Sequence, residues 1–189
     1  VRLIGLSARE STVDNLRQEG WFIPYTHLIQ FFFPDFFGNP ATLNYYGTWN
    51  YAEMVGYIGI APLFLAIYAL IAVRNKRVFF FGTLFFISLI FATDNAISRI
   101  PFIWRLPFIS TSQPTRLLLV TDISLAILAA LGFNQLIAIN KKERVLVKLI
   151  GGFAVFYVAT WIFIVVFRGG GLISMKELAV TRNNLILPT

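Results

Sequence analysis

The chain has few side chains that could act on a substrate, and three of them precede its first long apolar stretch. His27 is the only histidine, Asp35 follows it closely, and Glu53 stands at the edge of the apolar stretch. An imidazole nitrogen and two carboxylates could hold a divalent cation, or one of them could accept a proton from a substrate hydroxyl. Their spacing fits no metal motif. The structural alternatives are a polar-face histidine, a turn-stabilising Asp35 and a helix-capping Glu53.

A second group of candidates is cationic and lies in a proline-rich stretch after the second apolar segment. Arg99, Arg105 and Arg116 alternate there with three prolines. Guanidinium groups bind phosphate through paired hydrogen bonds, and the phosphates found at a membrane surface belong to lipids and lipid-linked sugars. The alternative is that these arginines reach lipid headgroups or pair with Asp94 and Asp122.

Asp122 is the candidate that lies deepest in an apolar stretch. It follows Leu117 by five residues, which places it about 8 Å inside a helix that begins there. On helical spacing it shares a face with Thr115 and points into the bundle. A carboxylate in hydrocarbon is costly unless it is paired or used, so the spacing predicts a partner in Arg116 or Arg105.

The elements that position these residues are apolar helices. Of the 189 residues 57% are hydrophobic and 13% are charged, and the mean hydropathy is +0.72. That balance is typical of a membrane protein, and four stretches are long enough to be considered as spans. They are Met54–Val73, Val78–Ala92 with an extension to about Ala96, Leu117–Ile139, and Leu149–Phe167. We therefore predict an all-α integral membrane fold with about four transmembrane helices.

The net charge of +7 comes largely from short basic runs between these stretches. The links 74–77 and 141–148 hold seven of the 16 Lys and Arg residues, a pattern that sets topology and does not suggest a nucleic-acid partner. The positive-inside rule makes both links cytoplasmic. The predicted organisation is an outer segment 1–53, a four-span bundle 54–167 with an outer loop 93–116, and an outer tail 168–189 that leads to a further segment.

Aromatic residues are concentrated in the predicted outer segment. Thirteen of the 37 residues from Trp21 to Tyr57 are Trp, Tyr or Phe, which favours a position at the level of the lipid headgroups. If residues 23–33 form a helix, this helix has a polar and an apolar face, as expected for a helix that lies in the membrane interface. The polar face comprises Thr26, His27 and Gln30, and the apolar face Leu28, Ile29 and Phe32. Turn residues then predict an irregular aromatic loop.

Three motifs follow one another in the chain: "FFFPDFFGNP", "YYGTWNYAEMVGYIGIAPLFLA" and, after a basic link, "RLPFISTSQPTRLLLVTDISLAILAALGF". Their order over residues 25–135 resembles the YfhO-type bacterial membrane proteins. The matching residues are Phe33, Pro34, Phe37, Gly38, Tyr57, Gly59, Pro62, Pro107, Arg116 and Gly132. The chain departs from the family pattern where an arginine pair is reduced to the single Arg116.

The resemblance implies an integral membrane glycosyltransferase of the C superfamily in the bacterial plasma membrane. Its partners would be membrane lipids, a polyprenyl-phosphate-linked sugar on the outer face, and a cell-envelope polymer or lipid acceptor, with no cofactor except a divalent cation as an option. Such enzymes carry their principal acids in a first outer loop that this chain lacks. We therefore expect a fragment without the catalytic acid. The expected substrate-binding residues are His27, Asp35, Tyr45, Tyr46, Glu53, Arg105, Arg116 and Asp122.

Two other classes of function remain open from the sequence. A transporter or channel subunit would line a polar route with Asp122, Asn134 and Gln135, and a non-catalytic scaffold would pack against a partner's helices. Most of the polar candidates gather at the predicted outer end, whereas only Asn134 and Gln135 lie deep. This distribution favours an enzyme over a transporter.

Overall fold

The computed structural model describes residues 16, 20–48, 50–107, 109–138, 143–166 and 174–185. Its regular elements are helices, and the only β-type pairing among these residues is an isolated bridge between Ile23 and Thr93. The predicted all-helical class is confirmed. The 3₁₀ helices are η2 (Tyr25–Phe31), η3 (Pro40–Thr42) and η4 (Pro114–Leu117). The α-helices are α1 (Tyr51–Met54), α2 (Ile60–Ala72), α3 (Lys76–Ala92), α4 (Ala96–Ile103), α5 (Leu118–Ile137), α6 (Glu143–Val166) and α7 (Met175–Asn184).

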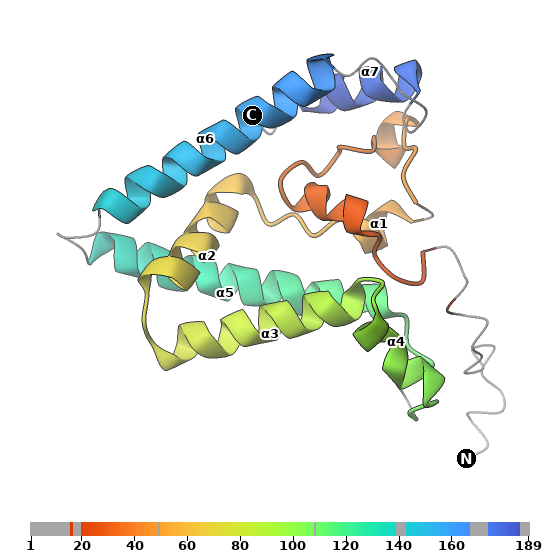
Figure 1. Cartoon of the computed structure of the whole chain (residues 1–189), viewed down its shortest axis with the longest axis horizontal. Coiled ribbons are helices and arrows are strands. Elements are labelled where there is room, and N and C mark those ends of the chain that lie inside the picture. The colour runs from red at the N-terminus through yellow and green to blue at the C-terminus, as the bar shows by residue number, and fades with distance from the viewer. Residues whose placement is uncertain are drawn as a thin grey trace.

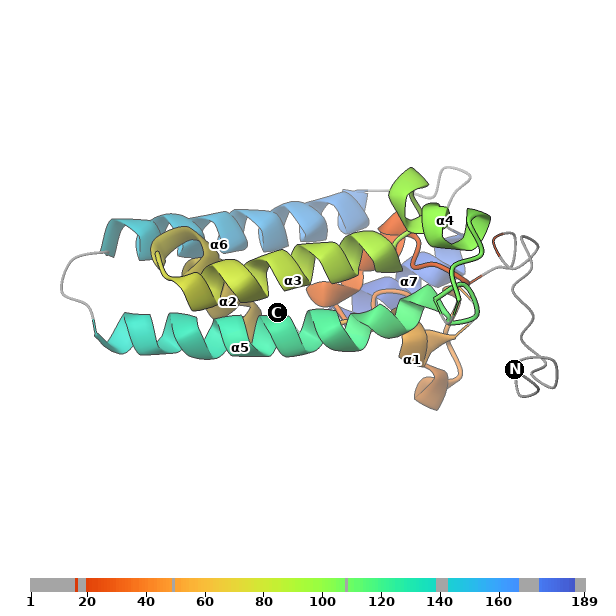
Figure 2. The ribbon, with the colours of Figure 1, turned by 90° about the horizontal axis from the view of Figure 1, so that it is seen from below.

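The core of the described bundle is formed by α2, α3 and α5, and α5 lies against both of the others (Figures 1 and 2). The contact of α5 with α2 is close: a Cβ added to Gly132 would lie 2.1 Å from the carbonyl oxygen of Leu65. Between α3 and α5 the hydroxyl groups of Ser88 and Thr121 are hydrogen-bonded at 2.8 Å, so two polar groups satisfy each other inside an apolar contact. Buried leucines such as Leu128 fill the same face of α5.

Helix α6 lies on the outside of this bundle. Its Phe153 meets Phe64 of α2 with ring centroids 5.3 Å apart. Near its C-terminal end, Arg182 of α7 donates hydrogen bonds of 3.2 and 3.0 Å to the carbonyl oxygen of Ile164, which satisfies one of the carbonyl groups that a helix end leaves free. Much of the remaining surface of α6 is apolar and exposed, as expected of a helix that faces lipid.

Two helical stretches are long and apolar enough to cross a membrane: Pro114–Ile137, which joins η4 to α5, and Arg144–Val166 in α6. Helices α2 and α3 reach that length only as a pair, and the pair is bent by 119° at its junction. The described residues therefore provide two candidate spans, or three if the bent pair is one span. These helices are consistent with a membrane protein, and the expected number of four spans stays a prediction.

The predicted continuous helix Met54–Val73 is wrong. Helix α1 ends at Met54, the chain is unwound from Val55 to Gly59, and α2 then has only 13 residues. Gly59 has φ = +99°, a conformation that a helix does not contain and that residues other than glycine rarely adopt. We call residues Val55–Gly59 the unwound segment.

The second predicted span also has different boundaries. Helix α3 begins at Lys76 because the side-chain oxygen of Asn75 accepts a hydrogen bond of 2.7 Å from the backbone N–H of Val78. It ends at Ala92 and does not extend to Ala96, because the backbone of Thr93 is extended. Helix α4 then starts in a stretch that was expected to be a loop.

The helix ends divide into two groups in space. Figures 1 and 2 place the turn between α2 and α3 at one end of the molecule, together with the last turn of α5 and the first turn of α6. Helices α1, α4 and α7 lie at the opposite end. The basic link 74–77 therefore lies far from most of the candidate residues. Which end faces the cytoplasm stays a prediction, and Lys141 and Lys142 of the second basic link lie outside the described residues.

Candidate functional site

The predicted interfacial helix is a 3₁₀ helix, η2, whose predicted polar face is largely turned inward. His27 is 2% exposed and Gln30 is not exposed at all, whereas Tyr25 is 59% exposed. The His27 ring stacks on Phe37 with a centroid distance of 4.4 Å and an interplanar angle of 20°. Of the three residues of the predicted polar face only Thr26 is exposed, because the loop that follows folds back over His27.

Both nitrogens of His27 have partners within this fold. Gln30 donates its side-chain N–H to the carbonyl oxygen of Pro34 at 2.9 Å, so its side-chain oxygen is left to accept from His27 Nδ1 at 2.6 Å. His27 Nε2 accepts from the backbone N–H of Thr48 at 3.3 Å. This arrangement requires a neutral imidazole with its proton on Nδ1. No nitrogen lone pair is left for a metal ion or a substrate proton, so His27 fixes the loop.

The titration of His27 makes fold stability depend on pH. Burial lowers the pKa of His27 from its usual 6.5, against the opposing effect of the Gln30 hydrogen bond. The unfolded chain therefore takes up a proton first as the pH falls below 6.5, and stability is lost from there down to the lower folded pKa. We expect the melting temperature to fall between about pH 7 and pH 5, because the free energy of unfolding drops by at most about 1.4 kcal/mol per pH unit.

Thermal unfolding of wild type and His27→Gln over this pH range measures the effect. His27 is the only histidine, so the variant should be less stable at pH 7 but should show a flatter pH dependence. An identical slope in both proteins would assign the titration to other groups.

Asp35 organises the same loop. Its carboxylate accepts hydrogen bonds from the Tyr51 hydroxyl at 2.5 Å and from the Asn39 side chain at 3.0 Å, and its carbonyl oxygen accepts one from Asn184 of α7 at 3.0 Å. Burial raises the pKa of Tyr51 well above its usual range, and the hydrogen bond and negative charge of Asp35 add to that shift. Asp35 thus ties three parts of the chain together.

Tyr45 and Tyr46 use their hydroxyl groups inside the loop as well. The Tyr45 hydroxyl donates to the carbonyl oxygen of Thr48 at 2.7 Å, and burial raises its pKa to about 12. The Tyr46 hydroxyl lies 3.2 Å from the carbonyl oxygen of Phe36 and also contacts the hydroxyl of Thr181 in α7. Burial raises the pKa of Tyr46, which keeps it protonated at neutral pH. The expected role of Tyr45 and Tyr46 in substrate binding stays a prediction.

Glu53 joins two segments that lie far apart in the sequence. Its carboxylate accepts a hydrogen bond of 2.9 Å from the hydroxyl of Thr115, which is 1% exposed. The cap of α1 is Asn50, whose side chain accepts from Ala52 N–H at 3.2 Å, and not Glu53. Since Glu53 binds Thr115 and His27 has no free nitrogen, the predicted cation site of His27, Asp35 and Glu53 is not assembled.

A cavity of about 360 Å³ lies beside Arg116. Its walls come from Phe91 at the end of α3, from Pro101 and Phe102 of α4, and from Leu117. Among the described residues Arg116 forms no ion pair, and its side chain is exposed. The cavity thus combines one unpaired cation with mainly apolar walls.

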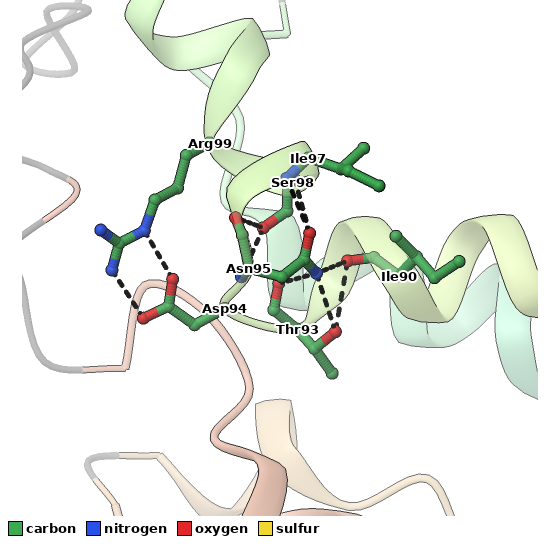
Figure 3. Close-up of polar contacts among 7 residues, drawn as sticks. All are labelled: Ile90, Thr93, Asp94, Asn95, Ile97, Ser98 and Arg99. Carbon is green, nitrogen blue, oxygen red and sulfur yellow. Dashed lines mark hydrogen bonds and ion pairs between the residues drawn. The ribbon is translucent and has the colours of Figure 1, made fainter.

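The other two arginines of this stretch do not line that cavity. Arg99 is held by Asp94 through two hydrogen bonds of 2.7 and 2.8 Å, as the pairing alternative expected (Figure 3). Arg105 is exposed and has φ = +52°. Of these three candidate phosphate-binding arginines, only Arg116 lines this cavity.

A capping network fixes the wall of the cavity that α4 provides (Figure 3). The side-chain oxygen of Asn95 accepts from the backbone N–H groups of Ile97 and Ser98 at 2.9 Å each. In return, Ser98 Oγ accepts from Asn95 N–H at 3.0 Å, which completes a capping box. The Asn95 side chain also donates to the carbonyl oxygen of Ile90 at 2.6 Å and so links α4 to α3. This corner gives α4 a defined direction next to Arg116.

Asp122 has a different environment from the one predicted. One carboxylate oxygen, Oδ1, is buried and has no hydrogen-bond partner among the described residues. Neither Arg116 nor Arg105 forms an ion pair with it, so the predicted partner is wrong. Asn134 and Gln135 lie on α5 three turns further along and are not enclosed with it.

Sequence reasoning missed several residues that organise these sites. Tyr51 and Asn184 hold Asp35, and Thr181 holds the carbonyl oxygen of Phe36 at 2.9 Å. Asn184 and Thr181 lie more than a hundred residues from the loop, so no local pattern connects them. The one available signal was the Ser174–Glu177 spacing of a capping box, which predicts where α7 begins but not what it contacts.

No family model, curated protein or solved structure matches this chain. The fold and the sites therefore define a class only: an all-helical protein with two or three stretches able to cross a membrane. Its candidate residues fall into three separate places, which are the aromatic loop, the cavity beside Arg116 and the interior at Asp122.

Proposed function

We propose that this chain is part of a multi-spanning membrane glycosyltransferase, similar to the YfhO-type proteins. It would transfer a sugar from a polyprenyl-phosphate donor to a cell-envelope polymer or lipid on the outer face of the bacterial plasma membrane, with both basic links cytoplasmic. The observation that carries this proposal is the cavity beside Arg116, where a guanidinium without an ion pair in the described part of the chain meets mainly apolar walls. A phosphate attached to an isoprenoid chain needs both kinds of surface.

Arg116 would act on the charge of the leaving group. In the transfer, the bond between the anomeric carbon and the phosphate oxygen breaks, and the anomeric carbon bonds to the acceptor oxygen. The acceptor proton passes to a base that we do not assign to a described residue. Negative charge grows on the leaving phosphate, and a guanidinium placed beside it stabilises that change. Phe91 and Leu117 would contact the first isoprene units.

A binding experiment tests the proposal. We expect the purified protein in detergent to bind a polyprenyl-phosphate-linked sugar saturably, and Arg116→Gln to raise Kd by about tenfold or more, because a hydrogen bond to a charged group contributes about 1.5–3 kcal/mol. Arg105→Gln is the matched control, since it removes the same charge from the same end of the molecule without touching the cavity. Its Kd should stay within about threefold of the wild-type value.

Two results would contradict this assignment. If polyprenol without phosphate competes as well as polyprenyl phosphate, the cavity recognises only the apolar chain. If Arg116→Gln and Arg105→Gln weaken binding equally, the effect is general electrostatic attraction.

A transporter or channel subunit is the second candidate, and a specific observation favours it. One carboxylate oxygen of the half-buried Asp122 is buried without a partner among the described residues, and the chain is unwound between α1 and α2. Interrupted helices and buried carboxylates are features of ion-coupled transport. We place it second because Asn134 and Gln135 do not join Asp122 in a continuous polar route.

A further inference from the structure

The unpartnered oxygen of Asp122 is not explained by the side chains around it. The neighbouring hydroxyl groups already have other partners: Thr121 donates to the carbonyl oxygen of Leu117 at 3.1 Å, and Ser124 donates to that of Val120 at 2.7 Å. No Lys or Arg among the described residues lies within ion-pair distance of Asp122. Asp122 is half-buried on α5, and an ionised carboxylate with an oxygen shut off from water needs a positive partner.

The unwound segment has unpaired polar groups of its own. Among the described residues, no hydrogen bond involves the backbone of Gly56, Tyr57 or Ile58. Gly56 is buried and the other two are half-buried. Unpaired backbone carbonyl groups inside a membrane protein are normally tolerated where they face water or an ion.

The packing of the two chain segments brings Asp122 and the unwound segment to the same level. A Cβ added to Gly56 would lie 2.9 Å from Leu118 of α5, and Leu65 meets Gly132 further along. The unwound segment and α2 therefore run in the same direction as α5. Asp122 follows Leu118 by one turn on the same face, which is about 6 Å along the axis. From this spacing we infer that Asp122 lies at the level of the residues that follow Gly56.

We propose that Asp122 and the backbone carbonyl groups of the unwound segment bind a monovalent alkali cation, with Na⁺ as the ion to test. One carboxylate neutralises one positive charge, and carbonyl oxygens supply the remaining ligands that a hard cation prefers. A divalent ion would need more acidic ligands. No group of three or more His, Cys, Asp or Glu side chains able to hold a metal occurs in the part of the chain that the structure describes.

The melting temperature of the purified protein in detergent tests this site. We compare NaCl with choline chloride at equal ionic strength, because choline is too large for such a site. We expect a saturable rise of about 5 °C or more when Na⁺ is in large excess over its Kd. Asp122→Asn should abolish the rise, because it keeps the shape and removes the charge. Asp94→Asn should keep it, since Asp94 is exposed and paired with Arg99.

Equal melting temperatures in the two salts, or an undiminished Na⁺ effect in Asp122→Asn, would overturn the proposal. If Asp122→Asn does not fold, binding of radioactive Na⁺ to the wild-type protein decides: displacement by unlabelled Na⁺ but not by choline supports the site, and no bound Na⁺ refutes it. These results do not depend on the glycosyltransferase proposal, which is tested by polyprenyl-phosphate binding at Arg116.

Discussion

Gly132→Ala is expected to push α5 away from α2. The new Cβ would lie 2.1 Å from the backbone carbonyl oxygen of Leu65, and a backbone atom cannot move aside as a flexible side chain can. Ala69 is also close, at 3.3 Å, so a shift along the helix is obstructed as well. We expect a loss of about 3 kcal/mol or more in the free energy of unfolding, measured as a lower midpoint of thermal or denaturant unfolding in detergent.

Gly152→Ala in α6 is the matched control. The same methyl group added there meets no atom within 4 Å. Alanine also favours helix over glycine, by about 1 kcal/mol in water. The control should therefore unfold at the wild-type midpoint or slightly above it. A comparable loss in both variants would mean that the close contact of α2 with α5 is not what Gly132 provides.

Gly38→Ala is expected to disrupt the aromatic loop while leaving the helical bundle in place. Gly38 has φ = +85°, and an added Cβ would lie 2.3 Å from the carbonyl oxygen of Asn44. The left-handed backbone alone costs about 1–2 kcal/mol for other residues, and the clash adds to that cost. Because Phe37 covers His27, loosening this turn should move the pKa of His27 back towards 6.5. NMR titration of the single histidine measures that shift directly.

Leu43→Asn in the same loop should stabilise the protein. Leu43 has φ = +53° and is 95% exposed, so it bears the cost of a left-handed conformation without burying its side chain. Asparagine tolerates this conformation better, and we expect stability to rise by up to about 1 kcal/mol. A His27 pKa that stays low in Gly38→Ala would show that the turn at Gly38 does not hold Phe37 over His27. A large loss of stability in Leu43→Asn would show that the Leu43 side chain contributes to the stability of the loop.

Most residues that resembled a catalytic set serve as supports in the structure. His27, Asp35 and Tyr46 form their hydrogen bonds within the aromatic loop or between the loop and α7. Such a saturated network is rigid, because each polar group has a partner that would be left unpaired by a movement. In the described part of the chain, Arg116 has no ion pair and Asp122 Oδ1 has no hydrogen-bond partner, and the two proposals rest on these residues.

The sequence by itself determined the properties that depend on local composition. The long apolar stretches predicted the helices that became α5 and α6, because the length of an apolar run sets whether a helix can cross hydrocarbon. The turn residues after Phe33 predicted an irregular aromatic loop, and its position at the level of the lipid headgroups stays a prediction.

Only the tertiary structure decided which polar residues are free. Asp35 is held by Asn184, Glu53 by Thr115, and the wall beside Arg116 by the corner at Asn95. Two of these three contacts join residues more than sixty positions apart, so their existence depends on how helices stack and not on any local pattern. The break of the first predicted span has the same origin. A glycine permits an unwound backbone, but the packing of Gly56 against Phe31 and α5 places it there.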